Sequence, residues 1–513
     1  MQASSFYMPN EYLERILKAR VYDVAIETPL ELAPRLSRRL GNNVYFKRED
    51  LQPVFSFKLR GAYNKIAHLS DTVAKRGVIC ASAGNHAQGV ALAAQRRGIP
   101  AIIVMPQTTP QIKVKAVADL GGEVVLHGDD YDHAYEHALE LARERSLTFI
   151  HPFDDPDVIA GQGTIGMEIL RQLPGTSIDA IFVAVGGGGL IAGIAAYVKN
   201  LFPHIRIIGV EPEDADAMYR SLEAKTRVTL DRVGIFADGV AVRRVGEETF
   251  RLAQQYVDEV ILVSNDELCS GIQDIFEDNR AIVEPAGALS VAGIKKYVAR
   301  EGCRDRTFVG INCGANMNFD RLRHVAERAD IGGEREALIA VEIPEQKGSF
   351  LRFCETLGRR SVTEFNYRYR EGADAQLFVG LALSQGKKEK EEIIKMLRDA
   401  GYPVVDMSDN EMAKLHVRYM VGGHAPGLEH ERLFRFEFPE RPGALLKFLH
   451  AIGTQWNITL FHYRNHGSDY GRVLAGVQIP PSESVDFDLH VRELKYVYTE
   501  ETENPAYRMF LGA

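Results

Sequence analysis

The sequence predicts an α/β domain followed by two small α+β units, and two observations carry that prediction. Up to about residue 325, short β-rich runs alternate with amphipathic or alanine-rich runs, as in GVICAS (77–82) followed by HAQGVALAAQRRG (86–98). Such strand–loop–helix repetition is typical of a sheet with buried, mostly parallel strands. From about residue 335 the chain instead repeats itself, which predicts two homologous units.

The α/β pattern continues through AIIVMP (101–106), EVVLHG (123–128), RIIGVEP (206–212) and TFVGI (307–311). One stretch, AIFVAVGGGGLIAGIAAYV (180–198), has no charge and is long enough to cross a membrane. Four consecutive glycines interrupt it, and glycines in series favour a loop over a helix. We therefore expect a strand, a glycine loop and a helix here, and no membrane span.

The repeat pairs IPEQKGSFLRFCETLG (343–358) with FPERPGALLKFLHAIG (438–453), and SVTEFNYRY (361–369) with NITLFHYRN (457–465). Each copy shows the order strand, helix, strand, strand, helix, strand, which is the ferredoxin-like order. We expect an oligomerisation module or a small-molecule sensor. The predicted domains are residues 1–325, a linker at 326–335, and the two repeat units 336–423 and 424–513.

The composition excludes several classes of protein. The 513 residues carry a formal net charge of −9 without a basic arm or stripe, which argues against a nucleic-acid partner. Five cysteines without CxxC spacing suit a reducing compartment and speak against a disulfide scaffold or a metal site. The N-terminus has no apolar signal core, so we expect a cytoplasmic protein.

A lysine and a glycine run indicate the chemistry. In SFKLRGA (56–62), Lys58 stands between Phe57 and Leu59, whose apolar side chains would desolvate its amine and make it nucleophilic. The glycines at 186–189 would let backbone N–H groups and a helix N-terminus converge on an anion, although tight packing without a ligand would also explain them. Because nucleotide motifs are absent, the combination points to pyridoxal phosphate, bound to the lysine as a Schiff base.

Four motifs stand in order along the chain: SFKLRGA, SAGNHAQG (82–89), the tetraglycine run, and VEPAGA (283–288). Over about residues 5–325 the chain resembles the fold-type II pyridoxal phosphate enzymes, specifically threonine and serine dehydratases. The two repeats resemble paired ACT-like regulatory units. Taken together, the chain resembles the family of biosynthetic threonine deaminases.

The resemblance implies a role for each matched position. Lys58 would carry the cofactor and act as the acid/base at the substrate Cα, and Asn85 would bond the cofactor's phenolic oxygen. Ser82, Asn85 and His86 would receive the substrate carboxylate. Gly239 and Glu284 would lie near the reacting groups. The phosphate would be held by Gly186, Gly187, Gly188, Gly189 and Leu190.

Two positions separate this chain from relatives. Cys313, in NCGAN (312–316), stands where the family usually has a serine facing the pyridine nitrogen. A thiol is the weaker hydrogen-bond partner, but either residue is neutral and would leave that nitrogen largely unprotonated. Ala83 stands where racemases of the family carry a proton-donating serine. A methyl group cannot transfer a proton, so we expect no efficient racemisation.

The implied reaction is deamination of L-threonine, and more weakly L-serine, to 2-oxobutanoate and ammonia, the committed step of isoleucine biosynthesis. Isoleucine would inhibit and valine would activate, with Tyr367 and Tyr463 as the regulatory candidates, in a homotetramer. Three simpler roles stay open: His86 as a satisfied core histidine, Glu284 as the start of a helix, and the two tyrosines as plain packing.

Rival functions also stay open. One is a broad serine/threonine dehydratase or a related β-replacement enzyme, which the paired sensor units disfavour. Another is a non-catalytic amino-acid sensor, which the intact Lys58, Asn85 and glycine run disfavour. A yellow colour of the purified protein would separate an enzyme from such a sensor.

Overall fold

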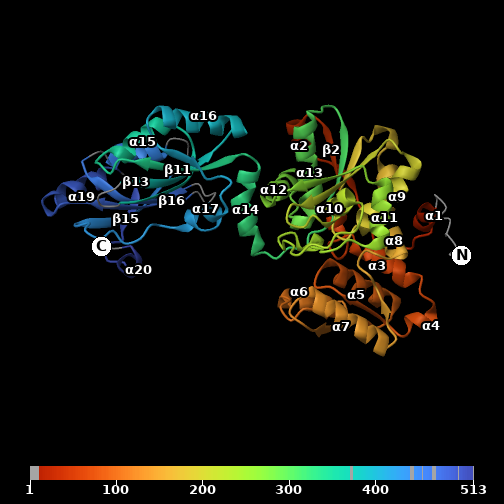
Figure 1. Cartoon of the computed structure of the whole chain (residues 1–513). Helices are drawn as coiled ribbons and strands as arrows, with labels where there is room; N and C mark the ends of the chain where they lie inside the picture. The colour runs from red at the N-terminus through yellow and green to blue at the C-terminus, as the bar shows by residue number, and fades with distance from the viewer. Residues whose placement is uncertain are drawn as a thin grey trace. The chain divides into compact units, whose positions relative to one another are not determined.

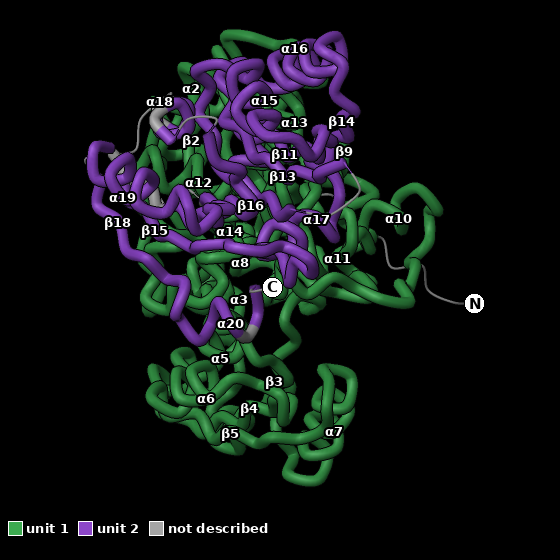
Figure 2. The backbone as a smooth tube through the Cα atoms, turned by 90° about the vertical axis from the view of Figure 1, so that its left-hand side faces the viewer, with its two compact units in different colours: residues 1–329 green, residues 330–513 purple. Residues whose placement is uncertain are grey.

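The computed structural model describes residues 11–369, 374–439, 444–452, 455–464, 470–494 and 496–511. The chain forms two compact units, residues 1–329 and 330–513, coloured separately in Figure 2. Helix α14 (Arg321–Gly332) runs through the stretch predicted as a linker and spans the boundary between the two units.

The larger sheet of the first unit has the strand order β1–β2–β10–β7–β8–β9. All of its neighbouring strands pair in parallel except β1 and β2. The mostly parallel sheet expected from the sequence is therefore confirmed. The strands are β1 (Leu30–Leu32), β2 (Asn43–Lys47), β7 (Ala180–Ala184), β8 (Arg206–Pro212), β9 (Glu259–Val263) and β10 (Thr307–Ile311).

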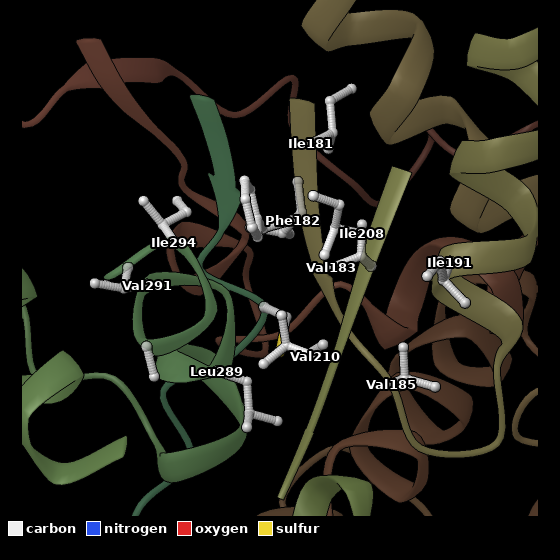
Figure 3. Packing of buried hydrophobic residues seen from close by; sticks show 14 of the residues in the cluster. Ile181, Phe182, Val183, Val185, Ile191, Ile208, Val210, Leu289, Val291 and Ile294 are labelled. Carbon is white, nitrogen blue, oxygen red and sulfur yellow. The ribbon is translucent and has the colours of Figure 1, made fainter. Parts of the chain in front are cut away.

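Helices cover both faces of this sheet (Figure 1), and its central strand β7 is apolar throughout. Every residue of β7 is buried. Figure 3 shows Phe182 and Val183 of β7 between Leu289 and Ile294 of one helix and Ile191 of another. The helices of this part are α1 (Glu11–Leu17), α2 (Pro34–Leu40), α3 (Lys58–Ala67), α8 (Pro156–Gln172), α9 (Gly189–Leu201), α10 (Ala217–Ala224), α11 (Glu247–Tyr256), α12 (Asn265–Asn279) and α13 (Pro285–Glu301). The short helix α4 (Asp71–Ala74) lies away from this sheet, at the lower right of Figure 1.

A smaller subdomain lies at one side of the first unit, in orange in Figure 1. Its sheet has the order β5–β4–β3–β6 and is parallel throughout. The strands are β3 (Val78–Ala81), β4 (Ala101–Met105), β5 (Glu123–Leu126) and β6 (Thr148–Phe149), and the helices are α5 (Asn85–Arg97), α6 (Gln111–Ala118) and α7 (Tyr131–Glu144). We call these elements the small subdomain and the rest of the first unit the large subdomain.

The uncharged stretch 180–198 folds as expected into strand β7, a glycine loop and the first ten residues of α9. Among the described residues, no helix is long and apolar enough to cross a membrane.

Four fully buried charges join the large sheet to helix α3. Arg60 donates to both oxygens of Glu49 at 2.8 Å and to both oxygens of Glu168 at 2.6 and 3.0 Å. Lys47 lies 2.6 Å from Glu168, and all four side chains are fully excluded from solvent. Two cations and two carboxylates balance, so the cluster carries no net charge. We call it the Arg60 cluster.

The second unit contains one continuous eight-stranded sheet, in the order β14–β11–β13–β12–β16–β17–β15–β18, with antiparallel pairs throughout. The two repeats meet where β12 pairs with β16. The first repeat comprises β11 (Glu336–Ile343), α15 (Ser349–Leu357), β12 (Val362–Arg368), β13 (Ala375–Ala382), α16 (Gly386–Asp399) and β14 (Val404–Asp406). The second comprises β15 (Glu431–Pro439), α18 (Ala444–Ile452), β16 (Asn457–Arg464), β17 (Tyr470–Gln478), α19 (Ser484–Glu493) and β18 (Val497–Glu500).

The ferredoxin-like order is thus confirmed in both copies, and each copy ends in a short helix. These are α17 (Glu411–Leu415) and α20 (Pro505–Phe510). Ala413 of α17 and Tyr507 of α20 each belong to a separate buried cluster against their own repeat's strands. The main core of the sheet instead includes residues of α15, α16, α18 and α19.

Candidate active site

A cavity in the first unit is lined by residues from all four sequence motifs. SFKLRGA, the tetraglycine run and VEPAGA each contribute more than one residue, and SAGNHAQG contributes Asn85. It holds about 530 Å³ of empty space, its open mouth included. The predicted residues on its wall are Lys58, Asn85, Gly186, Gly187, Gly188, Gly189, Leu190, Gly239, Glu284 and Cys313. The structure therefore brings together positions that lie up to 255 residues apart, from Lys58 to Cys313.

Lys58 is the first residue of α3, and backbone contacts fix the segment before it. Ser56 forms an isolated antiparallel bridge with Gly314, and Phe57 N–H donates to the Cys313 carbonyl at 3.3 Å. The lysine motif and NCGAN are thus tied together. Burial lowers the pKa of the Lys58 ammonium below its usual value, opposed by the nearby Cys313 and Glu284. Because its pKa is lowered, a larger fraction of the Lys58 side chain is the neutral amine, which is the form that acts as a nucleophile or a base.

The glycine loop runs from the end of β7 into α9, and its shape leaves no room for side chains. A Cβ on Gly187 would lie 2.2 Å from the Phe153 ring, and Gly188 has a φ of +96°. The loop is pinned from behind because Thr249 Oγ1 donates to the Gly187 carbonyl at 2.6 Å. Gly188 caps α9 without a side-chain hydrogen bond. The first N–H groups of that helix are therefore available to an anion.

Two polar residues of the cavity wall, Asn85 and Glu284, belong to a hydrogen-bonded chain of three side chains. Asn316 Nδ2 donates to Asn85 Oδ1 at 2.7 Å, and Asn85 Nδ2 donates to Glu284 Oε1 at 2.6 Å. Burial raises the pKa of the Glu284 carboxyl to about 7, with Asp238 adding to the rise. Gly239 and Gly314 are both needed beside this chain, since a Cβ on either would lie within 3.2 Å of Glu284 Oε1.

Two predicted residues lie off the cavity wall. His86 is 3% exposed, and its Nε2–H donates to the Ile150 carbonyl at 2.8 Å. Burial, with the Lys58 charge, lowers the pKa of His86 to about 3, so the ring is neutral. Ser82 Oγ accepts from Gly84 N–H at 3.2 Å. Both residues flank the N-terminus of α5, where Gly84 provides no side-chain cap.

Cys313 is buried, and its thiol donates to the Ala286 carbonyl at 3.3 Å. Burial raises the pKa of this thiol, so it stays protonated and neutral. Cys313 therefore has the neutral character that the sequence suggested for a partner of the pyridine nitrogen.

Sequence reasoning missed Asn316 and part of the cavity wall, including Phe57, Phe153 and Gln162. Asn316 is the last residue of NCGAN, a motif in which the sequence indicated a role for Cys313 alone. Phe57 was noted only as an apolar neighbour of the lysine, although it forms part of the wall. Phe153 and Gln162 also line the cavity, and no local pattern in HPFDDPDVIAGQG marks either of them.

The donor set fits pyridoxal phosphate. The glycine loop provides a cradle that a Cβ would fill, the helix α9 N-terminus provides N–H donors, and Lys58 provides an amine of lowered pKa. Phe57, Val240 and Ala286 provide an apolar wall for an aromatic ring. A buried amine facing such a cradle defines a pyridoxal-phosphate-dependent enzyme.

Comparison with known proteins agrees. The family model described as pyridoxal-phosphate dependent enzyme matches residues 21–314. The model described as the C-terminal regulatory domain of threonine dehydratase matches twice, at residues 327–417 and 422–511.

Relatives match over nearly the whole chain. The biosynthetic L-threonine dehydratase of Burkholderia multivorans is 57% identical over 98% of this chain and 99% of its own. That of Escherichia coli is 54% identical over 98% of this chain and 97% of its own. The solved structure of processed threonine deaminase isoform 2 from Solanum lycopersicum is 54% identical, with a TM-score of 0.62 over 63% of this chain and 88% of its own.

The chain therefore belongs to the threonine dehydratase family of pyridoxal-phosphate-dependent lyases, and it carries the family's C-terminal regulatory domain. Pyridoxal phosphate is its cofactor.

The tight contact between Phe153 and the glycine loop gives a first prediction. Gly187→Ala should largely abolish cofactor binding, because its Cβ would lie 2.2 Å from the Phe153 ring and displace the loop. The absorbance of bound cofactor after dialysis measures this. The double variant Gly187→Ala with Phe153→Ala removes the clash and should recover part of the binding. Full binding by the single variant would contradict the steric argument.

Glu284 gives a second prediction, for the protein without cofactor. Its pKa is raised to about 7 in the folded state, so folding favours the protonated carboxyl. The stability it contributes is complete below its unfolded pKa of about 4.3 and is lost as the pH rises through 7. Relative to Glu284→Gln, the wild-type free energy of unfolding should fall by about 4 kcal/mol between these limits, at 1.36 kcal/mol per pKa unit.

Denaturant unfolding of both proteins at several pH values between 4.5 and 8 measures this difference. Parallel stability curves for the wild type and Glu284→Gln would show that the carboxyl does not titrate as the buried environment requires.

Proposed function

We propose that the chain deaminates L-threonine, and more weakly L-serine, as the committed step of isoleucine biosynthesis. The observation that carries the proposal is Lys58, an amine of lowered pKa that faces the glycine loop in a chain whose relatives are named biosynthetic threonine dehydratases. The products would be 2-oxobutanoate and ammonia.

The N-terminus of α5 would bind the substrate carboxylate, because its first N–H groups are uncapped and carry the positive end of the helix dipole. Ser82, beside that terminus, would add a hydroxyl donor. His86 would contribute its backbone N–H and not its ring, since the ring Nε2–H is bonded to the Ile150 carbonyl.

When bound, pyridoxal phosphate supplies an electron-withdrawing ring conjugated with the substrate Cα. Lys58 Nζ, whose pKa is lowered by burial, would take the Cα proton and then protonate the departing β-hydroxyl, which leaves as water. Asn85 is kept in position by Glu284 and Asn316. The released enamine takes up one water and yields 2-oxobutanoate and ammonia, so L-threonine is converted without an external oxidant or reductant.

A second cleft, in the regulatory unit, supports feedback by an amino acid. About 390 Å³ of empty space lies between the loop after β11 and the start of β16. Tyr367 OH donates to Glu345 Oε1 at 2.7 Å on its wall. Trp456, also on the wall, is 4% exposed, and its Nε1–H has no hydrogen-bond partner among the described residues.

This cleft suits the three parts of isoleucine. Glu345 would pair with the ammonium group, and Trp456 Nε1–H would donate to the carboxylate. Ile343, Phe350 and Ile458 form an apolar wall for the side chain. Tyr463, the counterpart of Tyr367 in the second repeat, is 1% exposed on β16. The loop that corresponds to 345–348 in that repeat includes residues 440–443, which lie outside the described residues.

Isoleucine would inhibit by favouring one state of the enzyme over another, and valine would oppose it by favouring the alternative state. A homotetramer is proposed from the family resemblance and from the pairing of two sensor copies in each chain.

Formation of 2-oxo acid from L-threonine by the purified holoprotein, titrated with isoleucine and then valine, tests the function. We expect suppression by isoleucine and recovery with valine. Activity indifferent to isoleucine would remove the regulatory proposal, and no activity from a protein that still binds isoleucine would favour a sensor.

Tyr367→Phe should raise the isoleucine concentration for half-inhibition about tenfold, because a lost hydrogen bond to a charged group costs about 1.5–3 kcal/mol and 1.4 kcal/mol is tenfold. Tyr402→Phe is the matched control, since its ring packs on Phe353 away from the cleft wall. Equal inhibition of both variants and the wild type would remove Tyr367 from the site.

A further inference from the structure

One segment of the large subdomain closes the cavity on the side of the small subdomain. This segment, residues 226–246, connects α10 to α11 and contains the short 3-10 helix η3 (Asp238–Val240). Gly239, Val240 and Val242 line the cavity. A Cβ on Gly239 would lie 3.2 Å from Glu284 Oε1 and 3.9 Å from Asn85 Nδ2. The segment is therefore packed directly on the Asn85–Glu284 pair.

An ion pair joins this segment to the small subdomain beside the cavity. Lys113, in the first turn of α6, places Nζ 2.9 Å from Asp238 Oδ2. The two side chains are 21% and 34% exposed, so the pair lies at the surface with partial access to water. Arg321 lies 3.5 Å from the other Asp238 oxygen and donates to the Phe236 carbonyl at 2.9 Å. Asp238 is thus held from both subdomains.

Helix α6 is coupled to the catalytic residues through its neighbour α5. Val114 and Val117 of α6 share a buried cluster with Ala87, Val90 and Ala91 of α5, the helix that begins at Asn85. A movement of α6 toward Asp238 therefore carries Asn85 with it. The charges of Asp238 and Lys113 also act at Glu284 in opposite directions, which places the ion pair within electrostatic reach of the site.

We propose that Lys113 is a positioning residue: its ion pair with Asp238 holds the 226–246 segment, with Gly239, against Asn85 and Glu284, so that the substrate side of the cavity is complete. The inference rests on the proposed deamination of L-threonine. Without the pair, the small subdomain and the segment separate more often, and a smaller fraction of enzyme is competent to bind substrate.

Three lysine variants of the holoenzyme test this. Lys113→Met keeps the aliphatic stem and removes the charge, and Lys113→Arg keeps both charge and reach. Lys115→Met is the matched control, because Lys115 lies on the exposed side of the same helix. The first measurement is KM and kcat for L-threonine. The second is hydrogen–deuterium exchange of backbone amides 232–242 in the holoenzyme without substrate.

For Lys113→Met we expect KM to rise about two- to fivefold with kcat changed less than twofold, since ion pairs of this kind contribute up to about 1 kcal/mol. Exchange in 232–242 should become faster. Lys113→Arg and Lys115→Met should match the wild type in both measurements.

Wild-type KM in Lys113→Met, or wild-type exchange in 232–242, would overturn the inference. Failure of Lys113→Arg to restore both would also overturn it. If the wild type shows no activity with L-threonine, the proposed function fails, and the exchange measurement still decides whether Lys113 holds the segment.

Discussion

The active site depends on the Arg60 cluster, in which four charges are paired without access to water. Arg60 and Lys47 neutralise Glu49 and Glu168, and these residues come from α3, β2, the 3-10 helix after β2, and α8. Burying a charge is costly unless it is paired and hydrogen-bonded, so any element that moved away would leave an unpaired ion in the core. The cluster therefore fixes the start of α3, where Lys58 lies two residues before Arg60. The position of the Lys58 amine follows from this arrangement of buried charge.

Three other structural features complete the site around the Lys58 amine. The bridge between Ser56 and Gly314 brings Cys313 beside Lys58, and the glycine loop brings uncapped helix N–H groups into the same cavity. Asn85, Glu284 and Asn316 form a chain of hydrogen bonds that orients one polar wall. Polar groups that are hydrogen-bonded to one another in this way are held in place, and such rigidity is what lets a site bind a cofactor in one orientation.

Much of this could be predicted because the signals were local. The uncharged stretch 180–198 resolved into a strand, a loop and a helix through its glycines, and the repeat exposed two ferredoxin-like copies. Phe153 was not predictable, since its place on the cavity wall comes from the path of the chain between β6 and α8. Gln162 was not predictable either, since it reaches the wall from within α8, where its Oε1 accepts from Gly61 N–H of α3. The orientation of the His86 ring was not predictable for a similar reason. The ring is bonded to the Ile150 carbonyl because of how helix α5 packs beside the end of strand β6, and the residue type alone does not indicate this. Nor did the repeat indicate that both copies would share one sheet through β12 and β16.

The central claim is that Lys58, and no other lysine, carries the cofactor. The direct measurement is reduction of the holoprotein with borohydride, followed by proteolysis and mass spectrometry of the lysine that bears the pyridoxyl group. The account predicts the label on Lys58, in the peptide that contains SFKLRGA, with Lys47 and Lys113 unlabelled. A label on another lysine, or an active enzyme whose Lys58 stays unmodified, would contradict it.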